Sequence, residues 1–397
     1  MFSSDQILKI EKEISNKVNG KTLFDEFSRG RYSTDASVYQ IKPIGVVLPK
    51  DTNDVLNVME YSQKNSIPLL ARGGGSSQCG QTVGESLVLD YSRHQNNILE
   101  FNVKEKSIWV EPGVVLDHLN AYLKPFGLWF PVDVSTSSRA TIGGMSANNS
   151  CGSRSLYYGN MVHNVLAIET ILDDGSIHTF DEIQKNYLVQ KNNQDRLYKI
   201  IDKFIDLRQR VGGEIDENWP TTQRRVGGYN IDLINPNGFN SSNILVGSEG
   251  TLSLFNKIKL KLSELPKNKI LGVCYFDNFH QAMELTKEIV KLKPTCVELM
   301  DQNLLNLARE IPMYSEGIKK YIKGNPQAVL MVEFIDIEQS IYEKKIKDLE
   351  YLVLNQNKNN QFSYYSNLDE QKEVFEIRKA GLNILMSMNC LLYTYDA

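Results

Sequence analysis

Residues 71–82 read Ala-Arg-Gly-Gly-Gly-Ser-Ser-Gln-Cys-Gly-Gln-Thr and follow the apolar run Ile67–Ala71, which predicts a short strand. Consecutive glycines can adopt positive φ angles and turn successive backbone N–H groups toward one point, where an anion can bind. Ser76 and Ser77 add hydroxyl donors, and Arg72 adds a positive charge. The stretch predicts a loop that holds phosphate groups; the alternative is a flexible glycine turn.

Two familiar phosphate-binding loops do not match this stretch. Gly75, Gly80 and Thr82 are spaced as in a P-loop, but Gln81 stands where the lysine of that loop reaches the phosphates. Gln78 stands where the dinucleotide fingerprint of parallel α/β folds has its third glycine. Both families are therefore excluded.

A second stretch, residues 131–152, is dominated by small and hydroxyl-bearing side chains, which suits a backbone pressed against an extended ligand. Within it, Gly143 and Gly144 begin a predicted short helix. The first N–H groups of such a helix would be free to face phosphate. The alternative is a plain polar loop.

A third stretch, Gly247–Leu252, places Glu249 between glycines, just before the run Lys257–Leu262, whose alternating pattern predicts a half-buried strand. Two roles remain open for the Glu249 carboxylate: it accepts hydrogen bonds from a ligand, or it caps a turn.

Three motifs, RGGGSSQCGQ (72–81), PVDVSTSSRATIGGMSANNSCG (131–152) and VGSEGTL (246–252), occur in this order. Together they resemble the FAD-binding portion of the flavoprotein family typified by vanillyl-alcohol oxidase and p-cresol methylhydroxylase. Within that family, the chain is most similar to the branch of the glycolate oxidase D-subunit and D-lactate dehydrogenase. The resemblance is strong over residues 30–265 and looser elsewhere.

The resemblance implies an α+β fold with a two-subdomain FAD-binding domain followed by an α+β cap domain for the substrate. We expect a helical lead-in over residues 1–30, the FAD-binding domain over 31–265 and a partial cap domain over 266–397. Beyond residue 265, alternating strand and helix signals predict strands at 270–276, 295–299 and 328–335, with helices at 280–292, 302–309, 338–351 and 374–388. Because the last residues, Cys390–Ala397, do not read like a domain end, we expect a chain truncated at its C-terminus.

The resemblance also implies which residues contact the cofactor. The first loop would wrap the FAD pyrophosphate, and the second stretch would follow the flavin and the ribityl chain. Backbone groups around Val165 and Ile168 would border the adenine, and Glu249 with Gly250 would return to the cofactor. The full set of implied contacts is Arg72, Gly73, Gly74, Gly75, Ser76, Ser77, Gly80, Pro131, Asp133, Ser137, Thr141, Gly143, Gly144, Asn148, Ser150, Gly152, Val165, Ile168, Glu249 and Gly250.

The implied cofactor is non-covalent FAD, since the first loop lacks the histidine to which many relatives attach FAD. FMN is the alternative flavin. A thioether from Cys79 or Cys151 is a further alternative, but packing is the expected role of both side chains. No metal site is predicted, since the sequence contains no CxxC, HExxH or HxxxH pattern.

The implied reaction is oxidation of a small 2-hydroxy acid, of the D-lactate or glycolate type, by hydride transfer to flavin N5. Arginine can bind the substrate carboxylate through two hydrogen bonds. Arg378 lies in an IRKAG segment like that of the family, and Arg225 follows Arg224 in a segment like the family's RRVxGYN element; the sequence does not separate that pair. No residue is identified as the general base, and His163 is expected to be structural.

Two alternatives remain: a sugar or alditol oxidase of the same fold, or a flavin-binding subunit that is inactive without further sequence. The expected acceptor of electrons is a quinone, a cytochrome or an iron–sulfur protein, not NAD. The net charge of −4 does not favour nucleic acid as a partner, and no apolar run approaches the ~20 residues of a membrane helix. We therefore expect a cytoplasmic protein, or one peripheral to the inner face of the membrane.

Overall fold

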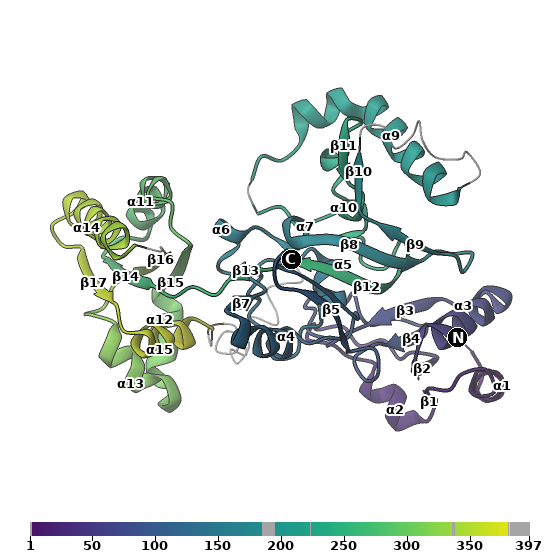
Figure 1. Cartoon of the computed structure of the whole chain (residues 1–397). Coiled ribbons are helices and arrows are strands. Elements are labelled where there is room, and N and C mark those ends of the chain that lie inside the picture. The colour runs from purple at the N-terminus through teal and green to yellow at the C-terminus, as the bar shows by residue number, and fades with distance from the viewer. Residues whose placement is uncertain (1, 185–194, 223, 336–337, 380, 382–397) are drawn as a thin grey trace. The chain divides into compact units, whose positions relative to one another are not determined.

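The computed structural model describes residues 2–184, 195–222, 224–335, 338–379 and 381 (Figure 1). The chain forms two compact units. The first comprises Met1–Gly152 and Gly159–Leu265, and the second comprises Ser153–Tyr158 and Pro266–Ala397. The mixed helix and strand fold expected from the sequence is confirmed.

The first sheet of the first unit has the strand order β1-β2-β4-β3, in which β2, β4 and β3 run parallel and β1 is an antiparallel edge. Every residue of β2 and β4 is buried, as is typical of parallel strands covered on both faces. Asp51 caps α3 by accepting a hydrogen bond from the amide of Asp54, and Thr52 is the first helical residue. The elements are α1 (Ser4–Ser15), β1 (Lys21–Leu23), α2 (Glu26–Arg31), β2 (Gly45–Leu48), α3 (Thr52–Asn65), β3 (Leu69–Arg72) and β4 (Leu87–Asp90).

The second sheet is antiparallel, with the order β5-β6-β12-β8-β9. As predicted for its strand, β12 buries Ile258 and Leu260, while the alternating residues Lys257, Lys259 and Lys261 are at least partly exposed. These side chains belong to the largest hydrophobic core of the unit. The elements are β5 (Ile98–Asn102), β6 (Ser107–Val110), α4 (Leu116–Leu123), η1 (Lys124–Phe126), β7 (Leu128–Trp129), α5 (Ile142–Asn148), α7 (Met161–Asn164), β8 (Val165–Ile171), β9 (Ile177–Phe180), β10 (Glu182–Gln184), α9 (Arg196–Asn218), η2 (Ile231–Leu233), β11 (Gly238–Asn240), α10 (Ser242–Leu245), β12 (Leu254–Lys261) and β13 (Ser263–Glu264).

The second unit is built on an antiparallel sheet with the order β15-β16-β14-β17. The predicted alternation of strands and helices is confirmed from β14 to α14, but α13 and β17 were not predicted. The last predicted helix, 374–388, begins earlier, at Leu368; residues 380 and 382–397, including Cys390–Ala397, lie outside the described part of the chain. The elements are α6 (Ser155–Tyr158), β14 (Lys269–Phe276), α11 (Phe279–Lys291), β15 (Cys296–Asp301), α12 (Gln302–Glu310), α13 (Pro312–Tyr321), β16 (Ala328–Ile335), α14 (Gln339–Gln356), β17 (Gln361–Tyr365) and α15 (Leu368–Lys379).

Candidate functional site

A cleft of about 450 Å³ lies within the first unit, and all three glycine-containing motifs line it. It passes the end of β3, the start of α5 and the turn that precedes β12. The structure thus brings together segments that are far apart in the sequence. The predicted residues that line the cleft are Arg72, Gly73, Gly74, Gly75, Ser76, Ser77, Thr141, Gly143, Gly144, Asn148, Ser150, Glu249 and Gly250.

The first and second motifs touch each other, and glycine makes this contact possible. A Cβ atom added to Gly73 would lie 2.0 Å from Oγ1 of Thr141, and one added to Gly74 would lie 2.1 Å from the carbonyl oxygen of Arg139. At these two positions glycine is required for close approach, whereas Gly75 adopts a positive φ of 63°.

The backbone N–H groups of residues 73–77 donate no hydrogen bond within the described residues. The predicted free N–H groups at the start of α5 are, by contrast, occupied. The amides of Ile142 and Gly143 donate to the carbonyls of Val114 and Pro112 (2.8 Å each), and the amide of Gly144 reaches the capping Oγ1 of Thr141. The expectation that α5 directs free amides at phosphate was therefore wrong, and the donors available for an anion lie in the first loop.

The side chain of Arg72 holds the first loop against an earlier segment of the chain. Its guanidinium donates to the carbonyls of Tyr32 (3.2 Å), Thr34 (2.7 Å) and Thr82 (3.1 Å), and it lies 5.2 Å from the ring centroid of Tyr32. The side chain therefore joins the first loop to the segment 32–43, which we call the strap. Its charge is already shared among three carbonyl oxygens, so its main role in this structure is to brace the loop.

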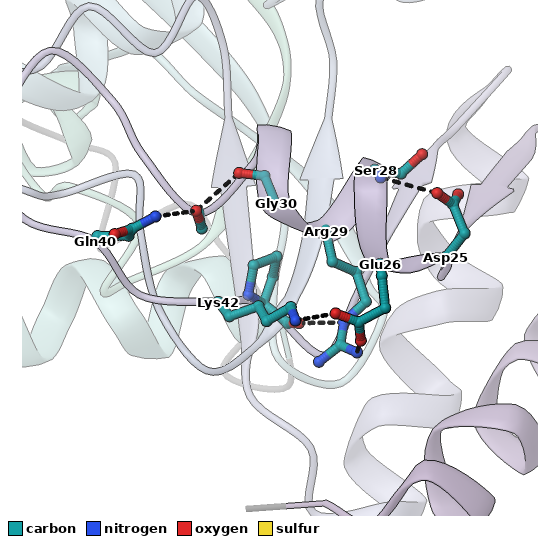
Figure 2. Close-up of polar contacts among 9 residues, drawn as sticks. Asp25, Glu26, Ser28, Arg29, Gly30, Gln40 and Lys42 are labelled. Atoms are coloured by element: carbon teal, nitrogen blue, oxygen red, sulfur yellow. Dashed lines mark hydrogen bonds and ion pairs between the residues drawn. The ribbon is translucent and has the colours of Figure 1, made fainter.

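Polar contacts of α2 side chains anchor the strap (Figure 2). Arg29 donates from Nε to the carbonyl of Pro43 (2.8 Å) and pairs with Glu26, which also pairs with Lys42 (Figure 2). Farther along, the Oγ1 of Thr82 donates to the carboxylate of Asp35 at 2.9 Å. The strap is thus fixed both to α2 and to the far end of the glycine-rich loop.

The turn that contains Glu249 is hydrogen-bonded to α5. The amides of Gly247 and Glu249 donate to the carbonyls of Ser146 and Ala147, near the C-terminal end of that helix. Glu249 itself adopts a positive φ of 47°, and its Oε1 accepts hydrogen bonds from Nδ2 of Asn148 (3.0 Å) and Nε2 of Gln81 (3.2 Å). One carboxylate oxygen therefore joins the three motifs.

Seven predicted contacts are not among the residues that line the cleft. The side chains of Val165 and Ile168 are buried in the hydrophobic core, and Ile168 is the register partner of Ile258 in β12. The contact expected of their backbone groups stays a prediction. Gly152 packs on Asp133, with a distance of 2.2 Å between an added Cβ and Oδ1. The full set away from the lining is Gly80, Pro131, Asp133, Ser137, Gly152, Val165 and Ile168.

Apolar residues that we did not predict also line the cleft; they lie in or next to strands, apart from Pro112. The sequence marks these positions only as apolar, which is equally the signal of a core strand. The main members are Leu69, Leu70, Tyr91, Pro112, Leu254 and Phe255.

Two of the arginines proposed for substrate already hold carboxylates. Arg378 lies 2.9 Å from Oε2 of Glu298 in the second unit. Arg225 pairs with Asp232, and its guanidinium lies 5.3 Å from the ring centroid of Trp219. Both cations are therefore partly neutralised.

Arg224 makes a different contact. Its Nε lies 2.8 Å from Sγ of Cys151, a residue of the cleft lining, and it pairs with no carboxylate within the described residues. The pKa of His163 is lowered by partial burial and by the positive charge of Arg225. Its Nδ1 accepts a hydrogen bond from the amide of Asn160, which suits the structural role expected of it.

No helix in the described ranges combines the length and the apolar character that crossing a membrane requires. The part of the chain that the structure describes also contains no group of three or more histidine, cysteine, aspartate or glutamate side chains placed to hold a metal ion.

Comparison with protein families finds two matches. Residues 43–181 match the FAD binding domain, and residues 265–397 match the C-terminal domain of FAD linked oxidases. The first range contains two of the three motifs that line the cleft.

Similar curated proteins include D-2-hydroxyglutarate dehydrogenase of Escherichia coli (strain K12), which is 31% identical over 83% of this chain and 33% of its own length. Glycolate oxidase subunit GlcD of Bacillus subtilis (strain 168) is 26% identical over 98% of this chain and 73% of its own. The chain spans about a third of the length of the D-2-hydroxyglutarate dehydrogenases that it matches.

Among solved structures, an alkyldihydroxyacetonephosphate synthase has the same fold. It superposes with a TM-score of 0.67 over 97% of this chain and 64% of its own, at 16% sequence identity. At that identity, the likeness concerns the fold alone.

Proposed function

Since the chain belongs to the FAD-linked oxidase family, we propose that it is a FAD-dependent oxidoreductase that oxidises a small 2-hydroxy acid. The observation that carries the proposal is the row of unpaired amides at residues 73–77 in the cleft. Five donors on a glycine-rich turn suit a pyrophosphate, the group that distinguishes FAD from FMN. The relatives named above, D-2-hydroxyglutarate dehydrogenase and glycolate oxidase subunit GlcD, support the substrate class.

The residues around the cleft fit the cofactor. Residues 73–77 would hold the pyrophosphate, and Asn148, Ser150 and Glu249 offer polar atoms to the rest of the molecule. When bound, FAD supplies a hydride acceptor at N5, so that a 2-hydroxy acid loses hydride from C2 and a proton from its hydroxyl and becomes a 2-oxo acid. We propose non-covalent binding, because the first loop has no histidine.

For the substrate carboxylate we propose Arg224 in place of Arg225. Arg224 contacts the cleft residue Cys151 and holds no carboxylate in the described residues, whereas Arg225 is paired with Asp232. A free guanidinium can bind a carboxylate through two N–H groups, which favours a 2-hydroxy acid over an uncharged alditol. Arg378 would first have to leave Glu298.

The test is reconstitution with FAD, followed by anaerobic titration of the bound flavin with D-2-hydroxyglutarate, D-lactate, glycolate and an alditol. We expect a flavin spectrum that acid precipitation releases into the supernatant, and bleaching by at least one hydroxy acid. A protein that takes up no flavin would refute the cofactor. Bleaching by the alditol alone would favour the sugar or alditol oxidase. FAD uptake without bleaching by any compound would favour the inactive flavin-binding subunit.

A further inference from the structure

The first unit has a second hollow, which lies along the helix α9 and has a volume of about 400 Å³. It shares no lining residue with the cleft described above. We call it the α9 groove. The buried side chains of Leu172, Phe180 and Leu245 form one part of its wall, and side chains of α9 form another. The groove is therefore a feature of the surface that the cofactor site does not use.

The helix α9 has more apolar surface than its own core covers. Ile201 and Ile205 are buried in the largest core of the unit, whereas Ile200, Phe204 and Leu207 line the α9 groove and are only partly buried. The intervals between these three residues, four and then three positions, are those of the apolar seam in a coiled coil. Because one apolar face is enough to pack a helix on its core, the second face is available to another helix.

Positive charges follow this seam at regular intervals. Arg196, Lys203 and Arg210 all line the groove and are spaced seven residues apart, beside the seam, where helices of a coiled coil pair their charges. Arg196 is paired with Asp173 and Asp174. The side chains of Lys203 and Arg210 are exposed and form no hydrogen bond or ion pair within the described residues. The groove thus combines apolar walls with two cations that have no acidic partner in the part of the chain that the structure describes.

The spacing of the charges favours an elongated occupant. From Arg196 to Arg210 the helix rises about 21 Å, so the single carboxylate of a fatty acid can pair with only one of the cations. A second copy of α9 would bring cations against cations. A helix with acidic residues at the same seven-residue interval can meet each of them while its apolar side chains fill the groove.

We propose that the α9 groove binds an amphipathic helix of a partner protein, one with an apolar seam and acidic residues that repeat every seven positions. The seam of the partner packs on Ile200, Phe204 and Leu207, and its carboxylates pair with Lys203 and Arg210. The apolar contact supplies most of the affinity, and the charges select an acidic helix and fix its register.

The experiment measures binding of a fluorescein-labelled peptide of about three heptads, with leucine along its seam and glutamate at the flanking positions, by fluorescence anisotropy. We expect the wild-type chain to bind this peptide at least about tenfold more tightly than the same peptide with lysine in place of glutamate. In Lys203→Glu an attractive pair becomes a repulsive one, so the acidic peptide should bind about fivefold more weakly. The matched control is Lys104→Glu, which makes the same charge change at an exposed residue that does not line the groove.

Four results would overturn the proposal. Equal affinity of Lys203→Glu and Lys104→Glu for the acidic peptide would place its binding outside the groove, and equal binding of the acidic and lysine peptides would remove the charge selection. Binding of dodecanoate that depends on Lys203, without binding of the peptide, would make the groove a site for a small anionic amphiphile. A dimer of the wild-type chain that dissociates in Lys203→Glu would make it an interface between two copies.

Discussion

The carboxylate of Glu249 accepts a hydrogen bond of 3.0 Å from the side-chain amide of Asn148, which lies 101 positions earlier in the chain. The same oxygen accepts from Gln81, 168 positions earlier. A single side chain therefore holds the edges of the cleft together, and it does so with an unfavourable backbone conformation. A non-glycine residue in the left-handed region costs about 1 kcal/mol, which the surrounding contacts offset.

Removal of this contact should loosen the cofactor site. In Glu249→Ala, the amides of Asn148 and Gln81 lose their shared acceptor, and we expect the dissociation constant of FAD to rise about tenfold. Fluorescence titration with FAD measures the change. Glu264→Ala is the control, because Glu264 forms a surface ion pair with Lys106 away from the cleft. Equal affinities in both variants would show that Glu249 has no part in holding FAD.

The contact between the first and second motifs allows no side chain at Gly74. In Gly74→Ala, the new Cβ would lie 2.1 Å from the carbonyl of Arg139, so the loop has to move away, and we expect FAD uptake to fall at least tenfold. Gly213→Ala is the control: this glycine lies inside α9 with nothing within 4 Å, so alanine should stabilise the chain by about 0.5–1 kcal/mol. Full FAD uptake by Gly74→Ala would contradict the prediction.

Much of the fold could be read from local patterns. The alternation of β12 depends on the neighbours of each residue, so the sequence predicts it. The strand β17 escaped prediction because its residues, Gln361–Tyr365, follow an asparagine-rich stretch and are paired with β14, almost 90 residues away. Such pairings are decided by packing.

The site residues likewise fall into those that a local sequence pattern predicts and those that only the folded chain reveals. The glycines that line the cleft were found because their spacing follows from backbone geometry. Tyr91 and Leu254 were missed, since only the folded chain shows that these apolar residues lie beside a cleft. The α5 amides were misjudged because their partners, such as Pro112, are distant in sequence. The contacts of Arg72 with Tyr32 and Thr34 could not be predicted for the same reason.

The three hydrogen bonds by which Arg72 holds the first loop require its guanidinium group. In Arg72→Lys, a single ammonium cannot reach three separate carbonyls or stack on Tyr32. We expect the free energy of unfolding to fall by about 1–3 kcal/mol and FAD affinity to fall with it. Urea unfolding measures the first effect. Arg93→Lys is the control, since Arg93 is exposed and makes no hydrogen bond in the described residues. Equal urea midpoints for Arg72→Lys and Arg93→Lys would show that the Arg72 guanidinium does not stabilise the loop.

In the second unit, the fully buried Glu333 of β16 pairs with Arg154 through two bonds of 2.6 and 2.7 Å. Glu333→Ala leaves the guanidinium without this partner, and we expect a loss of about 3–5 kcal/mol in urea unfolding. The double variant Arg154→Met with Glu333→Leu should recover most of it, since both charges are gone. A single variant as stable as the double would show that the pair matters little.

The lowered pKa of His163 predicts a dependence of stability on pH. Its causes are partial burial and the charge of Arg225, so the unfolded chain, with the ordinary value of 6.5, takes up the proton first. The free energy of unfolding should therefore decrease as the pH falls through about 6.5 and gain nothing from this group at higher pH. His163→Gln should reduce that slope between about pH 7.5 and 5.5, and the exposed His94→Gln is the control. By NMR titration, Arg225→Gln should raise the pKa of His163 toward 6.5. A pKa that stays the same in that variant would remove Arg225 as a cause.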